Sequence, residues 1–386
     1  MESADVVIVG AGVLGLASGY WLAKAGANVV ILEKGRIAWE ASGRATGFLS
    51  LRGEQPLEVP LAVAANELWT TLDEELGYPT EWLPGGRLWV AIEQDRWTEL
   101  QDLCPLWQAA GVPVRLIDGQ AARGIASCLG ERTLGGLHTT RSGHANPQRT
   151  SQAFAWAFRD RGGRVLENTP AIGIKTVRGK VTAVDTPQGS IATGAIVNCA
   201  GPQIGLIGEM VGVNIPVAPV RLEAMVTAPL PHLFDVAMVG HGLSLRQTRR
   251  GNIHFNGGPH EWIDVDLTSE PAKPNTPIVR NIARRLAELL PSLANIQALR
   301  SWAGIVEVTP DQTCIIDRLA SPEGMIIATA SGHGFGLAPS IGKAICDLVL
   351  NGKSSIPIDG LGLDRLATFD QGWRSTRKWV AGAYNT

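Results

Sequence analysis

A glycine-rich turn between a short apolar strand and a helix constrains this chain more than any other feature. Residues 5–9 (Asp-Val-Val-Ile-Val) form a β-branched apolar run of the kind that builds a buried parallel strand. The turn that follows places glycines at Gly10, Gly12 and Gly15. The first allows the tight turn, the second lets the backbone approach a pyrophosphate, and the third lets helix and strand pack closely. The alternative is a glycine turn that opens an ordinary βαβ unit.

An acidic residue further along supports dinucleotide binding. A helical stretch at about residues 16–25 is followed by a second apolar run, residues 28–32, which ends at Glu33. Glu33 can accept both ribose hydroxyls of an adenosine, while the phosphates lie at the positive N-terminus of the helix. A strand before the turn, a helix after it and an acid about 20 residues on distinguish a nucleotide site from a bare glycine triplet. The sequence therefore predicts a bound dinucleotide.

Small and hydroxyl-bearing residues dominate the segment 41–48, just beyond Glu33-Lys34-Gly35. Such a composition suits a backbone that passes close to a ligand. We expect Ser42 and Thr46 to donate hydrogen bonds and Arg44 to act as a counter-charge to phosphate. A solvated loop is the alternative, and the position directly after the predicted ribose acid argues against it.

Composition limits the remaining possibilities. At 386 residues the chain exceeds one comfortable core, so we expect two closely packed domains. The net charge of −2 offers no basic surface for nucleic acid or membrane, and no run of about 18 apolar residues is present to span a bilayer. The five cysteines lack paired spacing, which argues against disulfides or a metal site. Buried thiols, a cytoplasmic location and no export signal are expected.

The middle of the chain alternates helices and strands before an antiparallel region. Helices are expected at 61–76, 95–110, from 148 and at 276–290, and strands at 134–140, 165–166, 172–175, 181–185 and 195–199. Period-2 alternation over 215–260 predicts an antiparallel sheet with one face free to cover a pocket. His144, in the turn Gly143–Pro147, is either catalytic or a hydrogen-bonded turn residue, and we favour the second.

A second glycine-rich junction between a strand and a helix lies near the C-terminal end. The strand 325–330 leads into Ser331–Pro339, and a helix continues to residue 350. This junction directs a helix N-terminus at a group that becomes negative, whereas the first junction would hold a pyrophosphate. Two such junctions suggest a ligand that is held at both ends.

Together these residues resemble the D-amino acid oxidase family of flavoenzymes, especially its glycine oxidase, sarcosine oxidase and opine oxidase-like branches. The matching stretches are Gly10–Glu33, Ser42–Gly47, Gly143–Pro147, Asn198–Gly201, Thr309–Asp317 and Ser331–Gly342. The resemblance implies an α/β fold with a discontinuous Rossmann-like FAD-binding domain and an α+β substrate-binding domain built on an antiparallel sheet. We expect the FAD domain at 1–85, 145–215 and 300–386, and the substrate domain at 86–144 and 216–299.

The resemblance also assigns residues to the cofactor. FAD contacts are implied for Gly10, Gly12, Gly15, Glu33, Lys34, Ser42, Arg44, Thr46, Gly47, Gly201, Gly304, Gly332, His333, Gly334, Phe335, Gly336 and Leu337. The segment 332–337 would lie beside flavin N1 and the C2 carbonyl, where a helix N-terminus stabilises the anionic reduced flavin. The cysteine that tethers flavin in sarcosine oxidase aligns with Gly304, so we expect non-covalent FAD.

The implied reaction is oxidation of a carbon that bears an amine. A hydride passes to flavin N5, water hydrolyses the imine, and O2 is reduced to H2O2. Such sites orient the amine and the C–H bond and need no strong protein base. Two family anchors for a substrate carboxylate are missing: Ile305–Val308 replaces a stretch where glycine oxidases carry an arginine, and Gly336 replaces a lysine of sarcosine oxidase. We therefore expect an N-substituted glycine, an opine-type compound or a bulky amino acid.

Three residues are candidates for the substrate site. Arg52 lies where sarcosine oxidase places a carboxylate-binding arginine, and Arg246 lies on a strand expected to face the flavin. Either arginine can instead form a structural or surface ion pair. His260 falls near the position of an oxygen-activating lysine in sarcosine oxidase.

Three alternatives to an oxygen-dependent amine oxidase stay open. The chain can be the catalytic subunit of a multi-subunit amino acid or opine dehydrogenase that uses another electron acceptor. It can be a flavin-binding protein without amine oxidase activity. A nicotinamide-only dehydrogenase ranks last, because it leaves the second glycine junction unexplained. The expected partners are a small amine or amino acid, O2 or a partner acceptor, and further copies in an oligomer, with no nucleic acid.

Overall fold

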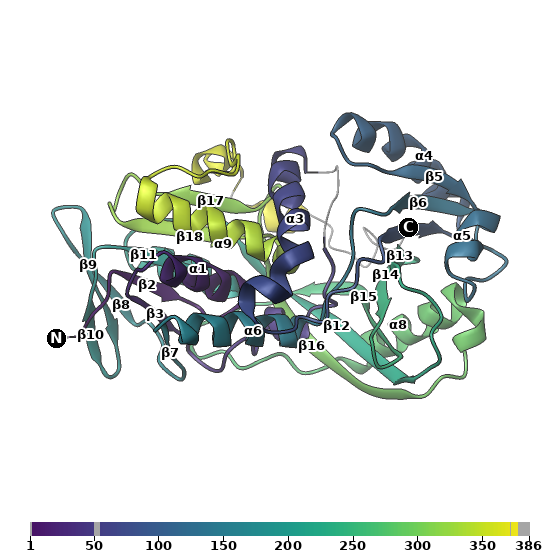
Figure 1. The fold of residues 1–386 in the computed structure, drawn as a ribbon, viewed down its shortest axis with the longest axis horizontal. Coiled ribbons are helices and arrows are strands. Elements are labelled where there is room, and N and C mark those ends of the chain that lie inside the picture. The colour runs from purple at the N-terminus through teal and green to yellow at the C-terminus, as the bar shows by residue number, and fades with distance from the viewer. Residues whose placement is uncertain (1, 50–54, 371, 377–386) are drawn as a thin grey trace.

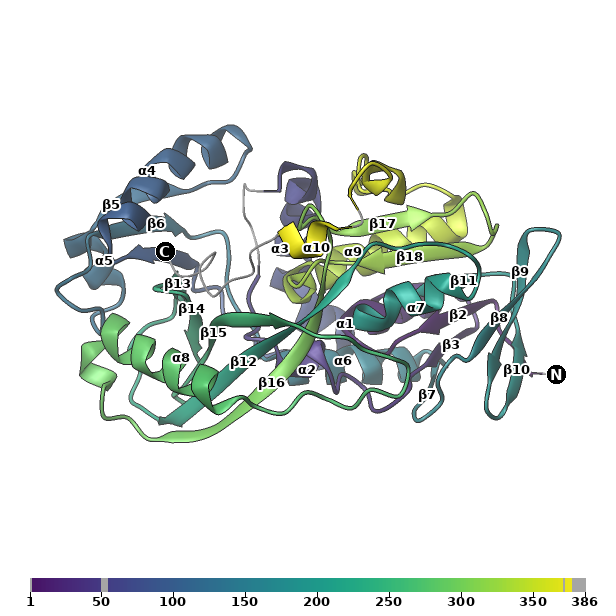
Figure 2. The ribbon, with the colours of Figure 1, turned by 180° about the vertical axis from the view of Figure 1, so that it is seen from behind.

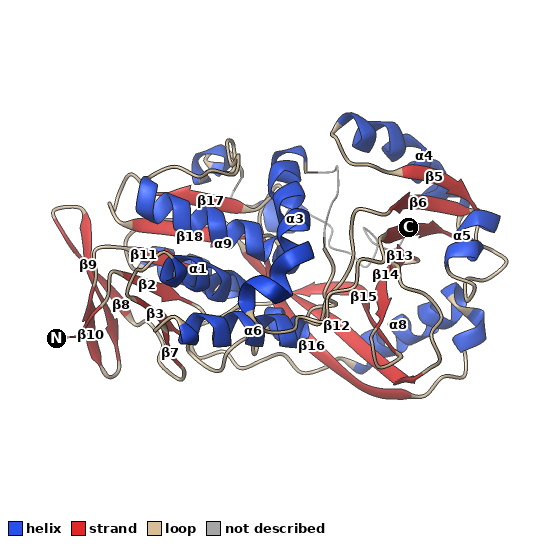
Figure 3. Ribbon diagram, in the orientation of Figure 1, coloured by secondary structure: helices blue, strands red, loops and turns tan. Residues whose placement is uncertain are grey.

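The protein is built from three β-sheets, and helices pack on the faces of the two larger ones, as Figure 1 shows. The structure is a computed structural model that describes residues 2–49, 55–370 and 372–376, without the side chain of Pro259. Figure 3 shows the helices gathered on the sheet faces, with the strands between them. The predicted α/β class is confirmed.

A six-stranded sheet with the order β17-β18-β11-β2-β3-β7 carries the first glycine turn. Its strands are β2 (Val6–Val9), β3 (Val29–Leu32), β7 (Arg164–Leu166), β11 (Ile196–Asn198), β17 (Ile315–Arg318) and β18 (Met325–Thr329). All pairings are parallel except β17 with β18. Strands β2 and β3 are buried throughout, which explains why they read as continuous apolar runs rather than alternating ones.

Helices cover both faces of this sheet. In Figure 1, α1 (Val13–Lys24), α9 (Gly334–Asn351) and α6 (Pro147–Asp160) lie over one face, beside α3 (Val59–Leu76). Figure 2 shows α7 (Ile204–Glu209) over the opposite face. Helix α6 begins as predicted, because the Asn146 side chain accepts from two backbone amides and Pro147 occupies the first turn.

An eight-stranded sheet with the order β16-β12-β15-β14-β13-β4-β6-β5 forms the other half of the molecule. Its strands are β4 (Arg87–Ala91), β5 (Arg115–Asp118), β6 (Gly135–Thr139), β12 (Ala218–Pro229), β13 (Ala237–Gly240), β14 (Leu243–Gln247), β15 (Asn252–Trp262) and β16 (Ala298–Val308). The sheet is antiparallel, as predicted, except that β4 and β13 pair in parallel. Helices α4 (Gln94–Ala109), α5 (Gly119–Ile125) and α8 (Thr276–Leu289) flank it.

The remaining elements are short. A four-stranded sheet holds β1 (Glu2–Ser3), β8 (Gly173–Val177), β9 (Lys180–Thr186) and β10 (Gly189–Ala192). The other helical turns are α2 (Ala41–Arg44), η1 (Pro56–Glu58), η2 (Gly201–Gln203), η3 (Pro291–Leu293), η4 (Leu363–Leu366) and α10 (Trp373–Thr376). The predicted domain boundaries stay a prediction. Strand β16 spans the predicted boundary at residue 300, and the whole strand belongs to the eight-stranded sheet.

One prediction from composition is confirmed in the core. All five cysteines are free and buried, at 104, 128, 199, 314 and 346. Trp69 and Trp107 are almost fully buried and belong to the same core cluster. None of the helices within the described ranges has the length and apolar character needed to cross a membrane.

Candidate functional site

The first glycine turn is packed so tightly that it excludes side chains. Gly10 has a φ of 103°, and a Cβ atom there would lie 2.5 Å from the carbonyl oxygen of Cys199. A Cβ atom on Gly15 would lie 2.0 Å from the carbonyl oxygen of Gly10. At Gly12 the nearest atom to such a Cβ is Ser42 Oγ, at 3.1 Å, so two predicted cofactor segments are in contact. Gly10 and Gly12 line the cavity described below without side chains, and such a backbone suits the approach of a pyrophosphate.

The carboxylate of Glu33 is fixed at the end of β3. Its Oε2 accepts from the Ala11 amide at 2.9 Å, and its Oε1 accepts from the Gly35 amide at 2.7 Å. Burial raises the pKa of this carboxyl group, and the two backbone hydrogen bonds oppose the rise. The neighbouring Lys34 donates to the Ser269 carbonyl at 2.7 Å. Both side chains line the cavity described below.

The loop after β3 contacts both large sheets. Ser42 Oγ accepts from the amide of Val13, the first residue of α1, at 2.9 Å, so its hydroxyl hydrogen is left for a ligand. Arg44 Nη1 donates to the Ala303 carbonyl at 2.5 Å, and its Nε donates to the Trp39 carbonyl at 2.8 Å. Arg44 therefore connects the loop to β16 in addition to lining the cavity.

Thr46, Gly47, Gly201 and Gly304 line the same cavity. Within the described part of the chain, the buried Thr46 Oγ1 has no hydrogen-bond partner. Gly47 has a φ of 89°, and a Cβ atom there would lie 2.2 Å from the Ala145 carbonyl oxygen. A buried hydroxyl without a protein partner, beside a glycine that has no room for a side chain, can hydrogen-bond to a ligand in the cavity.

The second glycine junction opens α9. Four of its predicted residues line the cavity: Gly332, His333, Gly334 and Phe335. Gly332 has a φ of 82°, and a Cβ atom on Gly334 would lie 2.8 Å from the Ala330 Cβ atom. Gly336 and Leu337 are buried in the first turn of α9 and do not line the cavity. The Gly336 carbonyl accepts from Trp69 Nε1 at 2.8 Å.

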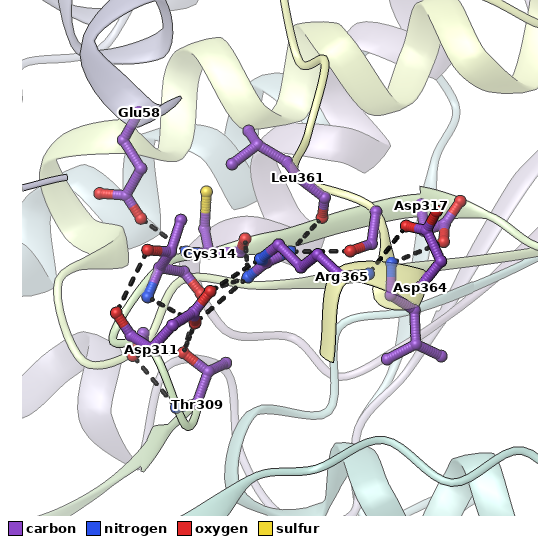
Figure 4. A network of polar contacts seen from close by, with 12 residues as sticks. Glu58, Thr309, Asp311, Cys314, Asp317, Leu361, Asp364 and Arg365 are labelled. Atoms are coloured by element: carbon purple, nitrogen blue, oxygen red, sulfur yellow. Dashed lines mark hydrogen bonds and ion pairs between the residues drawn. The ribbon is translucent and has the colours of Figure 1, made fainter. Parts of the chain in front are cut away.

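His333 is held between two hydrogen-bond acceptors. Its Nδ1 lies 3.0 Å from the Ser331 carbonyl oxygen, and its Nε2 lies 2.6 Å from Glu58 Oε2. The other carboxylate oxygen, Glu58 Oε1, accepts from the Cys314 amide at 2.6 Å (Figure 4). A carbonyl and a carboxylate therefore hold the His333 ring in place at the start of α9. Sequence analysis missed Glu58, since 275 residues separate it from its partner.

The Thr309–Asp317 stretch has a structural role. Arg365 Nε donates to Asp311 Oδ2 at 2.8 Å, and its Nη2 donates to the carbonyls of Thr313 and Cys314 (Figure 4). Asp311 Oδ1 in turn accepts from the Thr313 amide at 3.1 Å. The stretch thus holds the segment around η4 against β17.

One cavity of about 1360 Å³ extends from the first glycine turn to a face of the eight-stranded sheet. Pockets for single small molecules span roughly 300–1,000 Å³. The cavity therefore has room for a dinucleotide and a further small molecule. Its two ends are formed by different sheets, so that the second molecule would lie between the dinucleotide and the eight-stranded sheet.

The strand register places one row of side chains across the cavity wall. Val239 pairs with both Trp89 and Ser244, Ser244 pairs with Asn256, and Asn256 pairs with Ala224. All five residues line the cavity. Sequence analysis found the alternating strands but missed this row, because the pairing of residues as far apart as Trp89 and Val239, about 150 positions, is set by tertiary structure.

Arg246 lies on the same face, two residues along β14 from Ser244. It is buried, and its Nε donates to the Thr46 carbonyl. No ion pair links it to a carboxylate among the described residues, and neither Nη atom hydrogen-bonds to one of them. Burial lowers the pKa of Arg246 to about 10, so the side chain stays cationic at neutral pH. Arg246 is near the cavity but is not one of its lining residues.

Of the two other predicted substrate residues, Arg52 and His260, the structure describes only His260. Arg52 lies outside the described residues. His260 lines the cavity within an irregular part of β15, and burial lowers its pKa to about 4. A neutral imidazole supplies no positive charge for oxygen activation, which argues against that role for His260. His144 is a structural turn residue, as we favoured: it is fully buried and its Nε2 lies 3.1 Å from the Asp235 carbonyl oxygen.

These features define a class: a dinucleotide-dependent oxidoreductase in which a second sheet covers the reacting end of the cofactor. The chain belongs to the family of FAD-dependent oxidoreductases (DAO), whose model matches residues 5–348. It is 28% identical to sarcosine oxidase subunit beta of Rhodobacter capsulatus over 94% of this chain and 88% of that one. It is 29% identical to glycine oxidase of Geobacillus kaustophilus over 94% and 97% of the two chains.

Two solved structures have the same fold as this chain. The crystal structure of glycine oxidase from Geobacillus kaustophilus matches with a TM-score of 0.87 over 94% of this chain and 99% of that chain, at 25% identity. That of L-proline dehydrogenase from P. horikoshii matches with a TM-score of 0.86 over 95% and 98%, at 26% identity. The predicted family is confirmed.

FAD is the cofactor of this family, and the residues present fit it. The glycines of the two turns leave no room for a Cβ atom, so that the protein backbone itself can contact the cofactor. Thr46 Oγ1 has no hydrogen-bond partner among the described residues. Glu33 would bind the adenosine ribose, the first turn the pyrophosphate, and the Thr46 and His333 segments the flavin. Bound FAD supplies a two-electron acceptor.

Proposed function

We propose that the protein oxidises the C–N bond of an amino acid, of the N-substituted glycine, opine-type or otherwise bulky kind. The substrate carbon loses a hydride to FAD and the nitrogen loses a proton, which gives an imine. Water adds to the imine and releases an amine and a carbonyl compound. O2 takes up the two electrons with two protons as H2O2. The similarity to a glycine oxidase and a sarcosine oxidase subunit supports this reaction class.

One observation carries the proposal: the buried, cationic Arg246 beside the cavity wall makes no hydrogen bond or ion pair with a carboxylate among the described residues, although the charge of Glu81 acts on it electrostatically. A buried charge is costly unless it is paired, so Arg246 is expected to meet an anion when the site is occupied. A substrate carboxylate is the matching group, because a guanidinium binds it through paired hydrogen bonds that set orientation as well as affinity. His254, the cross-strand partner of Arg246, is neutral, so it does not compete with a substrate carboxylate for Arg246. Arg52 remains a second proposed anchor.

The reaction class is tested by reducing the flavin without air. A panel of amino acids, N-alkylglycines and opines is added to the yellow protein under anaerobic conditions. Bleaching by an N-substituted amino acid is the expected result. A flavin that stays oxidised with every amine would contradict the proposal and favour the flavin-binding protein without amine oxidase activity.

Arg246→Gln tests the anchor. Glutamine can still donate to the Thr46 carbonyl but carries no charge. We expect KM for the bleaching substrate to rise at least tenfold, since a charge-assisted hydrogen bond is worth roughly 1.5–3 kcal/mol. Arg52→Gln is the parallel variant. Unchanged KM in both variants would remove both arginines as anchors.

A second candidate keeps the chemistry but changes the acceptor. The similarity to sarcosine oxidase subunit beta favours a catalytic subunit that passes electrons to a partner protein. Fast anaerobic reduction followed by slow reoxidation in air is the expected signature. Fast reoxidation with stoichiometric H2O2 would establish an oxidase instead.

A further inference from the structure

Two neutral polar side chains face the cavity without a partner in the protein. The Ser244 hydroxyl and the Asn256 carboxamide lie opposite each other on β14 and β15, and both line the cavity. Neither side chain hydrogen-bonds to any residue in the part of the chain that the structure describes. Asn252 on the same strand behaves differently, because its Nδ2 donates to the Thr227 carbonyl at 2.9 Å. The unpaired groups are thus a property of the cavity wall and not of the strand.

The pair is flanked in its row by Ala224 and Val239, and in the next row of the same face by Arg246 and His254. Both side chains are half-buried, so water in the cavity can hydrogen-bond to them. A ligand that displaces this water loses those hydrogen bonds unless it replaces them, so it gains most by hydrogen-bonding to the pair. Asn256 presents both a donor and an acceptor, and Ser244 adds a hydroxyl. A neutral ligand group that both donates and accepts hydrogen bonds matches this pair.

The position of Arg246 sets the spacing of such a ligand. Residues two apart on a strand have Cα atoms roughly 7 Å apart and share a face. Arg246 and Ser244 are related in this way on β14. A carboxylate at Arg246 and a neutral polar group at the pair would be separated by a few carbon–carbon bonds.

We propose that Ser244 and Asn256 form a polar subsite that selects amino acid substrates carrying a carboxamide or hydroxyl group beyond the reacting carbon. This inference rests on the proposed function, in which Arg246 holds the carboxylate. Apolar substituents of the same size leave the Asn256 carboxamide unpaired and are rejected. A site built to hydrogen-bond a polar group discriminates strongly against the analogue that lacks it.

The test compares two carboxylates that have no amine and so cannot be oxidised. Succinamate and 4-methylpentanoate place a carboxamide and an isopropyl group of similar shape at the same distance from the carboxylate. Each is titrated into the FAD-loaded protein, and the dissociation constant is read from the change in flavin absorbance. We expect succinamate to bind at least tenfold more tightly. Asn256→Leu should reverse the preference, and Ser244→Ala, which removes one atom, should reduce it.

Asn295→Leu is the matched control, because Asn295 is exposed and lies outside the cavity. It should retain the wild-type preference. Equal binding of the two carboxylates, with both weakened by Arg246→Gln, would overturn the subsite while leaving the anchor intact. Binding of neither carboxylate, together with a flavin that no amino acid bleaches, would overturn the subsite and the proposed function together.

Discussion

At the scale of single residues, the site depends on glycines whose missing side chains make room for backbone or ligand. Gly15 is the clearest, since a Cβ atom there would lie 2.0 Å from the Gly10 carbonyl oxygen. The contact is with backbone and cannot be relieved by rotating a side chain, so the turn itself must move. Gly10 and Gly12, which face the cavity, would move with it.

Gly15→Ala should therefore weaken FAD binding. Overpacking of this kind typically costs about 1–3 kcal/mol, which corresponds to a loss of roughly tenfold to a hundredfold in affinity. The dissociation constant of FAD for the apoprotein measures it. Gly124→Ala, also within a helix but with no atom within 4 Å of the added Cβ, is the control and should bind FAD normally. Equal affinities would show that the turn can adapt.

At the scale of elements, the N-terminus of α9 combines a helix dipole with His333, whose Nε2 contacts the Glu58 carboxylate. The dipole places positive potential at this end of the cavity. Glu58 contacts the imidazole on the side away from the cavity, because Glu58 does not line the cavity whereas His333 does. The short helix η1 therefore positions a side chain at a junction far away in sequence.

Glu58→Gln should weaken FAD binding. The two carboxylate oxygens of Glu58 contact the Cys314 amide and His333 Nε2, and glutamine has only one acceptor oxygen to replace them. The His333 ring, which lines the cavity, would therefore be held less firmly. We expect a loss of about fivefold in affinity, since a hydrogen bond is worth about 1 kcal/mol. The dissociation constant of FAD for the apoprotein measures it, and an unchanged affinity would show that Glu58 does not position this junction for FAD.

At the scale of the whole molecule, the buried His144 and His254 and the half-buried His260 remain neutral in and beside the eight-stranded sheet. Burial lowers the pKa of His144 to about 3, that of His254 well below its ordinary value, and that of His260 to about 4. The unfolded chain takes up these protons near pH 6.5, whereas the folded protein does not. Below that pH the unfolded state binds more protons, so stability falls as the pH falls from about 6.5 towards the folded pKa values.

The free energy of unfolding should therefore decrease on acidification. Each fully neutral buried histidine contributes about 1.4 kcal/mol per pH unit in this window. His144→Gln should reduce the difference in stability between pH 7 and pH 5.5 by about that amount, as measured by urea unfolding of the FAD-loaded protein. His232→Gln is the control, because the His232 side chain is 67% exposed. Identical pH dependence of the wild type and His144→Gln would contradict the assignment.

Local patterns in the sequence were sufficient to predict the two glycine-rich junctions and the helices that follow them. The turn at Gly10–Gly15, the acid Glu33, the helix α9 and the cap at Asn146 depend on backbone conformation and on neighbours close in sequence, which one chain displays directly. Arg246 was already a candidate from the sequence, but its hydrogen bond to Thr46, the Ser244–Asn256 row and the Glu58–His333 contact could not be obtained in this way. They arise from strand register and from contacts between distant segments, such as the 275 residues that separate Glu58 from His333. A sheet surface is assembled by pairing several strands, and a shift of one residue in any pairing would present different side chains to the cavity, so only the tertiary structure decides which groups meet the substrate.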